Sequence, residues 1–225
     1  MDDDDIWEKG KLEKQLDFYE NKMNSNIGLL FTCVKVINEK NEHIGVFSNT
    51  AEGYIYDKMF YFNQVNATSS VMIREDVFKK VGYFREDPLL KGCEDYEMWL
   101  RIAKNFQIYS LNETLVTYRR HRDKLSNNRK KIEFAQFLAL YYALENDTSI
   151  DKNKVYNYLF KQFAINYYNL RDYTEYRKYF KIASAYGNLG IKLTIKYYFP
   201  KFIYLLKLLK AKIKGLIKNT LIFKL

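Results

Sequence analysis

The sequence opens on four consecutive carboxylates, Asp2-Asp3-Asp4-Asp5, whose composition suits a metal site. Like charges this close repel one another at neutral pH, and Mg²⁺ or Mn²⁺, which favour oxygen ligands, would relieve that repulsion. A cation bound there would neutralise charge on the phosphates of a leaving group. For such a run taken alone, an acidic and solvated tail is the simpler interpretation.

A second acidic pair, Glu94-Asp95, opens a predicted helix over residues 93–106. The positive end of a helix dipole favours carboxylates, so capping of the helix alone explains such a pair. His121 follows in Tyr118-Arg119-Arg120-His121. A neutral imidazole is a suitable metal ligand beside carboxylates, although a lone histidine is more often an ordinary surface or core residue.

The order of these features resembles the family 2 glycosyltransferases of the GT-A type, over residues 1 to 130. That family writes its metal motif as hydrophobic-D-x-D-D-x-W followed by K-L-E-x-Q, and residues 1–15 match it. The family pattern E-D-[YW]-[DE]-x-W-x-R-[IL] matches residues 94–102. Residues 77–86 match V-F-x-x-V-G-G-F-D-E, except that Tyr83 and Arg85 replace a glycine and an aspartate.

The resemblance implies a role for each site residue. Asp95 is expected to be the base that takes the proton of the acceptor hydroxyl, with Glu94 supporting it. The expected metal ligands, for Mg²⁺ or Mn²⁺, are Asp2, Asp4 and His121. The expected contacts with the donor sugar are Asp5, Ser69 and Ser70, although a buried strand with small residues explains the two serines equally well.

The resemblance also implies a function. We expect an inverting, metal-dependent transferase that moves a sugar from a nucleotide-diphosphate sugar to a glycan or lipid-linked acceptor, in the synthesis of cell-surface polysaccharides or glycoconjugates. Members of the family begin with a nucleotide-binding βαβα half that precedes the metal motif. This chain begins at the motif, so we expect a chain truncated at its N-terminus. The alternative is a catalytically inactive fragment that binds membranes.

The expected fold class is α/β: the C-terminal part of a GT-A fold with a mixed sheet, followed by an all-α extension. Hydrophobic patterning predicts helices over 11–23, within 52–62, over 75–81 and over 93–106, with Gly82 ending the third. It predicts strands over 27–37, 44–47, 67–74 and 107–119, the first two forming a hairpin. From residue 129 onward the chain reads as helical.

We expect three regions: a partial catalytic domain over 1–128, a helical hairpin within 129–190, and a basic amphipathic helix within 191–225. The net charge of +10 is uneven, because residues 176–225 hold 12 Lys and Arg and no Asp or Glu. The remaining residues are slightly acidic, which argues against nucleic acid as a partner. Two Cys and two His indicate a reducing, cytosolic setting without a zinc site.

The basic end of the chain has the pattern of a helix that lies on a membrane. Apolar residues recur at helical spacing from Phe199 to Leu221, flanked by lysines at four positions, Lys207, Lys210, Lys214 and Lys218. Lysines beside an apolar stripe bind anionic lipid surfaces, each contributing about 1 kcal/mol. We therefore expect a cytoplasmic protein held peripherally on the inner face of the membrane. A terminal helix docked on its own domain is the alternative.

Overall fold

A computed structural model describes residues 4–22, 26–121 and 128–200. The chain divides into two compact units, residues 1–150 and 151–225. The first unit holds a mixed five-stranded sheet and the second is helical over its described residues, as the sequence predicts. All the residues expected to take part in sugar transfer belong to the first unit.

The two central strands of the sheet, β2 (Ile27–Asn38) and β5 (Gln107–Arg120), are parallel. Three strands pair antiparallel to them: β1 (Ile6–Trp7) to β5, and β3 (His43–Phe47) and β4 (Met72–Ile73) to β2. A central strand covered on both faces is expected to be apolar throughout, and β2 is buried over nearly its whole length. The predicted hairpin of β2 and β3 is confirmed.

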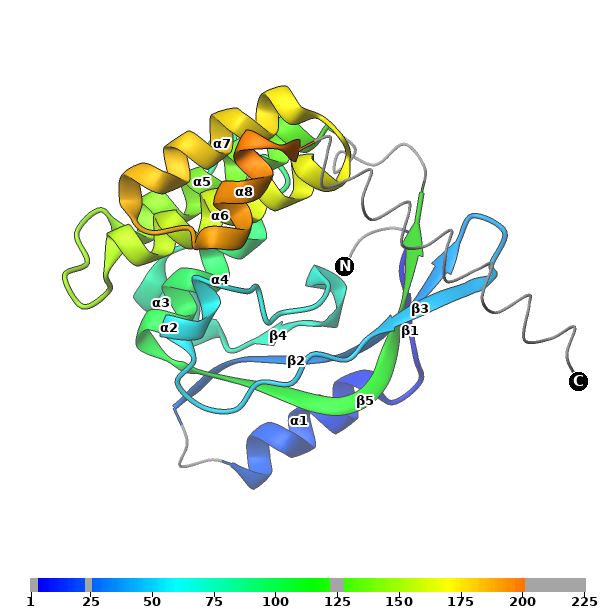
Figure 1. Ribbon diagram of the computed structural model, residues 1–225. Helices are drawn as coiled ribbons and strands as arrows, with labels where there is room; N and C mark the ends of the chain where they lie inside the picture. The colour runs from blue at the N-terminus through cyan, green and yellow to red at the C-terminus, as the bar shows by residue number, and fades with distance from the viewer. Residues whose placement is uncertain (1–3, 23–25, 122–127, 201–225) are drawn as a thin grey trace, which may run out of the picture. The chain divides into compact units, whose positions relative to one another are not determined.

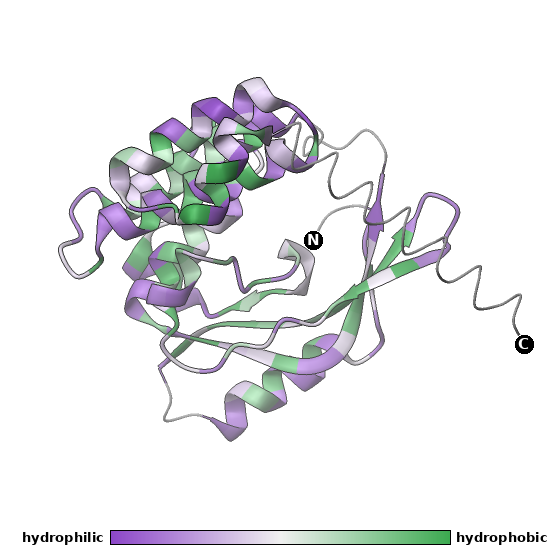
Figure 2. Cartoon of the chain, viewed as in Figure 1, coloured by the Kyte–Doolittle hydropathy of each residue, from purple (hydrophilic) through white to green (hydrophobic). Residues whose placement is uncertain are grey.

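Helices cover both faces of this sheet (Figure 1). Helix α1 (Lys11–Asn21) lies on one face, and α2 (Tyr56–Met59), α3 (Glu75–Val81) and α4 (Glu94–Asn105) lie on the other. In Figure 2, α1 alternates between hydrophobic and hydrophilic residues along its length. Helix α4 is more deeply embedded, because its Trp99, Ile102 and Ala103 are at most 1% exposed. These four helices agree with the predicted ones, and their ends differ by a few residues.

A glycine explains where α3 ends. Gly82 follows its last residue with a φ of +81°, a backbone conformation that residues with a side chain rarely adopt. Its N–H donates to the carbonyl oxygen of Phe78 at 2.8 Å, which closes the last turn. The predicted C-cap is therefore confirmed.

The strand predicted over 67–74 is mostly wrong. The structure has a 3₁₀ turn, η1 (Thr68–Ser70), and then only the two residues of β4 in strand conformation. The hydroxyl of Ser70 donates to the carbonyl oxygen of Ala67 at 2.6 Å. Serine side chains that bond the nearby backbone compete with strand pairing in this way.

Helix α5 (Arg129–Leu144) belongs to the first unit, which therefore extends beyond the boundary expected at residue 128. It packs against α4 and against the 3₁₀ turn η2 (Pro88–Leu90). The loop that follows α5 is tied to the same unit, since Asp147 forms an ion pair with Lys104 at 2.7 Å and accepts a hydrogen bond from Tyr56 at 2.8 Å. Tertiary packing, which sequence composition does not reveal, sets this boundary.

The second unit is a helical hairpin, as predicted, with a third short helix. Helices α6 (Lys152–Asn169) and α7 (Tyr173–Tyr186) pack through stacked aromatic rings, and α8 (Ile191–Tyr198) follows. Asp151 and Asp172 cap α6 and α7 by accepting backbone N–H groups. Lys207, Lys210, Lys214 and Lys218, predicted to bind membranes, lie outside the described residues. None of the helices that the structure describes combines the length and hydrophobicity needed to cross a bilayer.

Candidate active site

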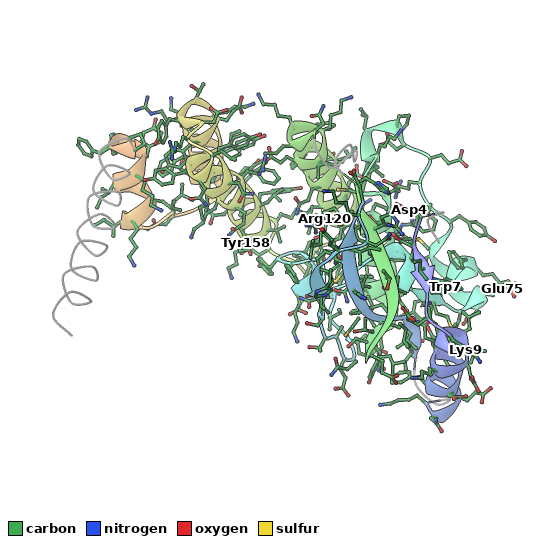
Figure 3. The ribbon with its side chains drawn as sticks, turned by 90° about the vertical axis from the view of Figure 1, so that its right-hand side faces the viewer. Asp4, Trp7, Lys9, Glu75, Arg120 and Tyr158 are labelled. Carbon is green, nitrogen blue, oxygen red and sulfur yellow. The ribbon has the colours of Figure 1, made fainter. Side chains whose placement is uncertain are left out.

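The acidic N-terminal segment is held in place by the edge of the sheet. Strand β1 pairs with β5, so that Ile6 faces Thr117 and Trp7 faces Val116. Figure 3 shows Asp4 and Trp7 along this segment, with Arg120 at the end of β5. The described part of the segment, from Asp4 onward, is thus positioned by backbone pairing.

A buried polar cluster joins this segment to the turn η1. The indole N–H of Trp7 donates to the carbonyl oxygen of Ser69 at 2.8 Å. The side-chain amide of Gln15, which is fully buried, donates to the carbonyl oxygen of Ser70 at 3.2 Å. Lys11 donates to Gln15 at 2.6 Å and lies 4.2 Å from the centre of the Trp7 ring. Trp7 and Gln15 therefore bind the backbone of η1, and Lys11 contacts both of these side chains.

Burial has an electrostatic consequence at Lys11, which is 1% exposed. Desolvation lowers the pKa of its ammonium to about 8. The cation is nevertheless placed over the indole face of Trp7, where the ring quadrupole attracts it. Lys11 is thus an internal support of the acidic segment.

Asp4 and Asp5, although adjacent, play different parts. Asp5 is 6% exposed, and its Oδ1 accepts the backbone N–H of Arg119 at 3.1 Å. The Oδ2 of Asp4 lies 2.6 Å from Nε2 of His121, and both side chains are partly exposed. The structure therefore brings together Asp4 and His121, two of the three predicted metal ligands. It buries the Asp5 side chain against β5.

The donor atoms of Asp4 and His121 fit a divalent cation in part. One carboxylate oxygen and one imidazole nitrogen lie side by side, which is a donor pair that Mn²⁺ accepts. Within the described residues, no group of three or more His, Cys, Asp and Glu side chains is arranged to hold a metal ion. The third predicted ligand, Asp2, lies outside those residues.

Asp95 lies in the first turn of α4 and contacts η1 through Thr68. Its Oδ2 accepts a hydrogen bond from the hydroxyl of Thr68 at 3.2 Å, and its Oδ1 accepts the N–H of Tyr96 at 2.6 Å. Burial raises the pKa of the Asp95 carboxyl above its usual range, against the opposing effect of these two hydrogen bonds. A raised pKa makes the ionised carboxylate a better base.

Glu94 differs from its neighbour in being exposed. Its carboxylate accepts the N–H of Gly92, a residue with a φ of +92° that ends the loop before α4. The contact fixes the entry to the helix, and the supporting role predicted for Glu94 stays a prediction.

The two serines predicted to contact the donor sugar lie in η1 and are at most 1% exposed. The Ser70 hydroxyl is already bound to Ala67, and the backbone oxygens of Ser69 and Ser70 accept hydrogen bonds from Trp7 and Gln15. Donor binding by these residues stays a prediction. The geometry establishes that η1 contacts Trp7 of the N-terminal segment through Ser69 and contacts Asp95 through Thr68.

Two features of the site did not emerge from the sequence. The first is Thr68, which sits beside the two serines that drew attention and is the residue that reaches Asp95. The second is a buried carboxylate, Glu97, which pairs with Arg101 at 2.8 Å and Arg85 at 2.7 Å. Arg101 also donates to the carbonyl oxygen of Tyr83 at 2.9 Å. Arg85, which departs from the family pattern, was the signal in the sequence that could have revealed this cluster, since it pairs with Glu97.

Two curated glycosyltransferases are similar to part of this chain. TuaG of Bacillus subtilis (strain 168), provisionally named a teichuronic acid biosynthesis glycosyltransferase, is 29% identical over 132 residues, which cover 58% of this chain and 49% of TuaG. The uncharacterised glycosyltransferase RT0329 of Rickettsia typhi (strain ATCC VR-144 / Wilmington) is 24% identical over 143 residues, which cover 61% of this chain and 43% of that protein. The chain thus spans about half the length of these curated relatives.

The family profile described as "Glycosyltransferase like family 2" matches residues 1–183. The match includes both acidic clusters, His121 and the whole of α5 and α6. It covers most of the chain and agrees with the resemblance carried by the motifs. The chain therefore belongs to the glycosyltransferase-like family 2.

Proposed function

We propose that the chain is the acceptor-binding and catalytic part of an inverting, metal-dependent glycosyltransferase. It transfers a sugar from a nucleoside diphosphate sugar to a glycan or lipid-linked acceptor in cell-surface polysaccharide synthesis. Family membership supports sugar transfer, and the name of TuaG supports a polysaccharide product. Because the chain spans about half the length of its relatives, activity and substrates remain proposals for it.

The observation that carries the proposal is the environment of Asp95. A sugar hydroxyl is a poor nucleophile until a base accepts its proton. In the proposed reaction the acceptor oxygen attacks the anomeric carbon, its proton passes to the Asp95 carboxylate, and the bond to the nucleoside diphosphate breaks. The raised pKa of Asp95 and its contact with Thr68 suit this role.

A divalent cation would neutralise charge on the departing diphosphate. Asp4 and His121 are the described residues that would hold it, and we propose Asp2 as the third ligand. The imidazole nitrogen favours Mn²⁺ over Mg²⁺, which prefers oxygen ligands alone. Asp5 holds the segment on β5 by accepting the N–H of Arg119, and its contact with the donor sugar remains a proposal from the family resemblance.

The test compares the wild-type chain with Asp95→Asn. Release of nucleoside diphosphate is measured across a panel of nucleotide sugars with Mn²⁺ and a membrane lipid extract as acceptor. We expect the substitution to slow turnover by about 10²- to 10⁴-fold while nucleotide binding is kept. Asp57→Asn, which removes an exposed carboxylate from α2, is the matched control and should lose far less.

Stability gives an independent check on Asp95→Asn. A carboxyl whose pKa is raised on folding binds protons more tightly in the native state, so its ionised form costs stability above the unfolded pKa. Asp95→Asn should therefore melt no lower than the wild type at neutral pH. Unchanged turnover in this variant would remove Asp95 from the mechanism.

The second candidate is a non-catalytic protein that binds anionic membranes through its basic C-terminal segment, at the inner face of the cytoplasmic membrane. The lysines at 207, 210, 214 and 218 favour it. It predicts liposome binding that disappears when residues 199–225 are deleted, together with no metal-dependent transfer by the intact chain. Transfer by the wild type would reject this candidate.

A further inference from the structure

A cavity of about 560 Å³ lies between α7 and α8 in the second unit. One face of α7 supplies three cations to it, Arg177, Lys178 and Lys181, at helical spacing. These side chains are exposed, and no acidic residue lines the cavity. Glu175 pairs with Lys178 at 3.6 Å, which leaves most of the positive charge uncompensated. A cavity of this charge selects an anion.

The other lining residues favour a ligand with both polar and apolar parts. Thr174 offers a hydroxyl, whereas Ile182 and Tyr197 offer apolar surface. The Tyr197 ring stacks on Phe180 of α7 with centroids 4.4 Å apart, which fixes this wall. Tyr176 of α7 donates to the carbonyl oxygen of Leu193 at 2.9 Å and ties α8 down as well. The cavity is therefore framed by packed elements.

An apolar strip on α8 borders this cavity. Four large side chains on the outward side of the helix and just after it are between 44% and 75% exposed: Ile191, Ile195, Tyr198 and Phe199. The Tyr198 ring contacts Tyr197, the cavity wall, with centroids 5.1 Å apart. Apolar side chains at spacings of four and three residues along one helix form a continuous strip. A soluble helix rarely leaves such a strip in water.

The charge around the strip indicates what covers it. Residues 151–200 hold 9 Lys and Arg against 3 Asp and Glu, and no acidic residue follows Glu175. Lys192 and Lys196 lie on α8 itself. An apolar strip beside a cationic cavity matches a surface with anionic groups above an apolar layer, which is the structure of an anionic lipid leaflet.

We propose that α7 and α8 form a docking surface for an anionic phospholipid bilayer. The cavity receives a lipid phosphate on Arg177, Lys178 and Lys181, and the strip on α8 enters the boundary of the acyl layer. This site is separate from the lysines at 207–218, and it does not depend on sugar transfer.

The experiment measures flotation of the full-length chain with vesicles of phosphatidylcholine alone or mixed with phosphatidylglycerol. The double variant Arg177→Gln/Lys181→Gln removes two cavity cations, and Lys152→Gln/Lys154→Gln removes two cations from the start of α6 as the matched control. Each cation near the surface is worth about 1 kcal/mol, so the cavity variant should bind mixed vesicles at least about tenfold more weakly than the control. All variants keep the lysines at 207–218.

A second pair of variants tests the apolar strip. Ile195→Gln and Ile44→Gln replace isoleucines of similar exposure, 44% and 47%, in α8 and β3. Losing a partly inserted isoleucine should weaken vesicle binding about fivefold for Ile195→Gln and leave Ile44→Gln at the wild-type level. Circular dichroism confirms that each variant is folded.

Three results would overturn the proposal. The first is equal vesicle binding by the cavity variant and its control. The second is wild-type binding that is the same with and without phosphatidylglycerol. The third is a pair of findings: the wild type binds free pyrophosphate or glycerol phosphate in the cavity, and the Arg177→Gln/Lys181→Gln variant still floats with vesicles. That pair would identify a site for a soluble phosphate compound.

Discussion

The two acidic clusters of the site are positioned in contrasting ways. Asp4 and Asp5 belong to a segment that backbone pairing holds on the edge of the sheet, through the two residues of β1. Glu94 and Asp95 begin α4, a helix of 12 residues whose inner side chains are buried against the sheet and the neighbouring helices. The position of the proposed base therefore depends on the packing of α4. The position of the proposed metal ligand Asp4 depends on the few hydrogen bonds that hold its segment on the sheet. Substitutions should therefore act on the two clusters through different residues.

The largest effect on stability is expected at Glu97, which lies in the same helix as Glu94 and Asp95. Glu97→Ala removes a carboxylate whose side chain is 2% exposed and leaves Arg101, 19% exposed, without its partner. Breaking a buried ion pair from one side costs about 3–5 kcal/mol. Urea unfolding should show this loss of stability, and Glu75→Ala, which breaks the exposed pair with Lys79, should cost less than about 0.5 kcal/mol. Equal effects would mean that α4 does not depend on this cluster.

A smaller effect is expected at the first cluster. Asp5→Ala leaves the N–H of Arg119 without its acceptor, which costs about 1–3 kcal/mol. Hydrogen exchange at the Arg119 amide should accelerate accordingly. Asp4→Ala removes a partly exposed carboxylate and should leave that exchange unchanged. The comparison fails if the two substitutions accelerate exchange alike.

Trp7→Phe tests the link between the acidic segment and η1. Phenylalanine keeps a ring beside Lys11 but loses the N–H that donates to Ser69. We expect a loss of about 1 kcal/mol in the free energy of unfolding. Tyr83→Phe, a control at a tyrosine that is 76% exposed and whose ring contact with Phe78 is kept, should change stability by much less. A neutral Trp7→Phe would show that β1 pairing alone positions the segment.

The smallest expected effect is a shift in titration. Thr68→Val removes the hydroxyl that stabilises the ionised form of Asp95, so the pKa of that carboxyl should rise further. Carbon-13 NMR of the Asp95 carboxyl measures this directly, and the acid limb of kcat/KM should move to higher pH in step. A pKa that falls would reverse the electrostatic account of the site.

Local patterns in the sequence predict the long elements well. The apolar run of β2, the amphipathic α4 and the glycine after α3 each carry their own signal. The segment 67–74 misled, because its β-forming residues are overridden by a hydroxyl that closes a 3₁₀ turn. The boundary after α5 depends on packing against α4, which no single segment encodes.

The sequence likewise predicted some residues of the site and missed others. The motifs place both acidic clusters and His121, and the structure shows the contact of His121 with Asp4. Thr68 and the partners of Glu97 were missed, because a hydroxyl or an arginine acquires its role only from what the fold brings beside it. Asp4 contacts His121, whereas Asp5 is buried and binds the backbone of Arg119, a difference that has no signature in a run of identical residues.

The setting of Trp7 also gives the chain an optical probe. The chain has two tryptophans, and Trp99 is 1% exposed whereas Trp7 is 36% exposed. Emission from Trp99 should be blue-shifted and shielded from quenchers, so the long-wavelength component belongs to Trp7. Because this indole is bonded to η1 and lies under the ammonium of Lys11, any ligand that moves the acidic segment should change its fluorescence. Occupancy of the site is therefore readable without a label and without knowing the substrate.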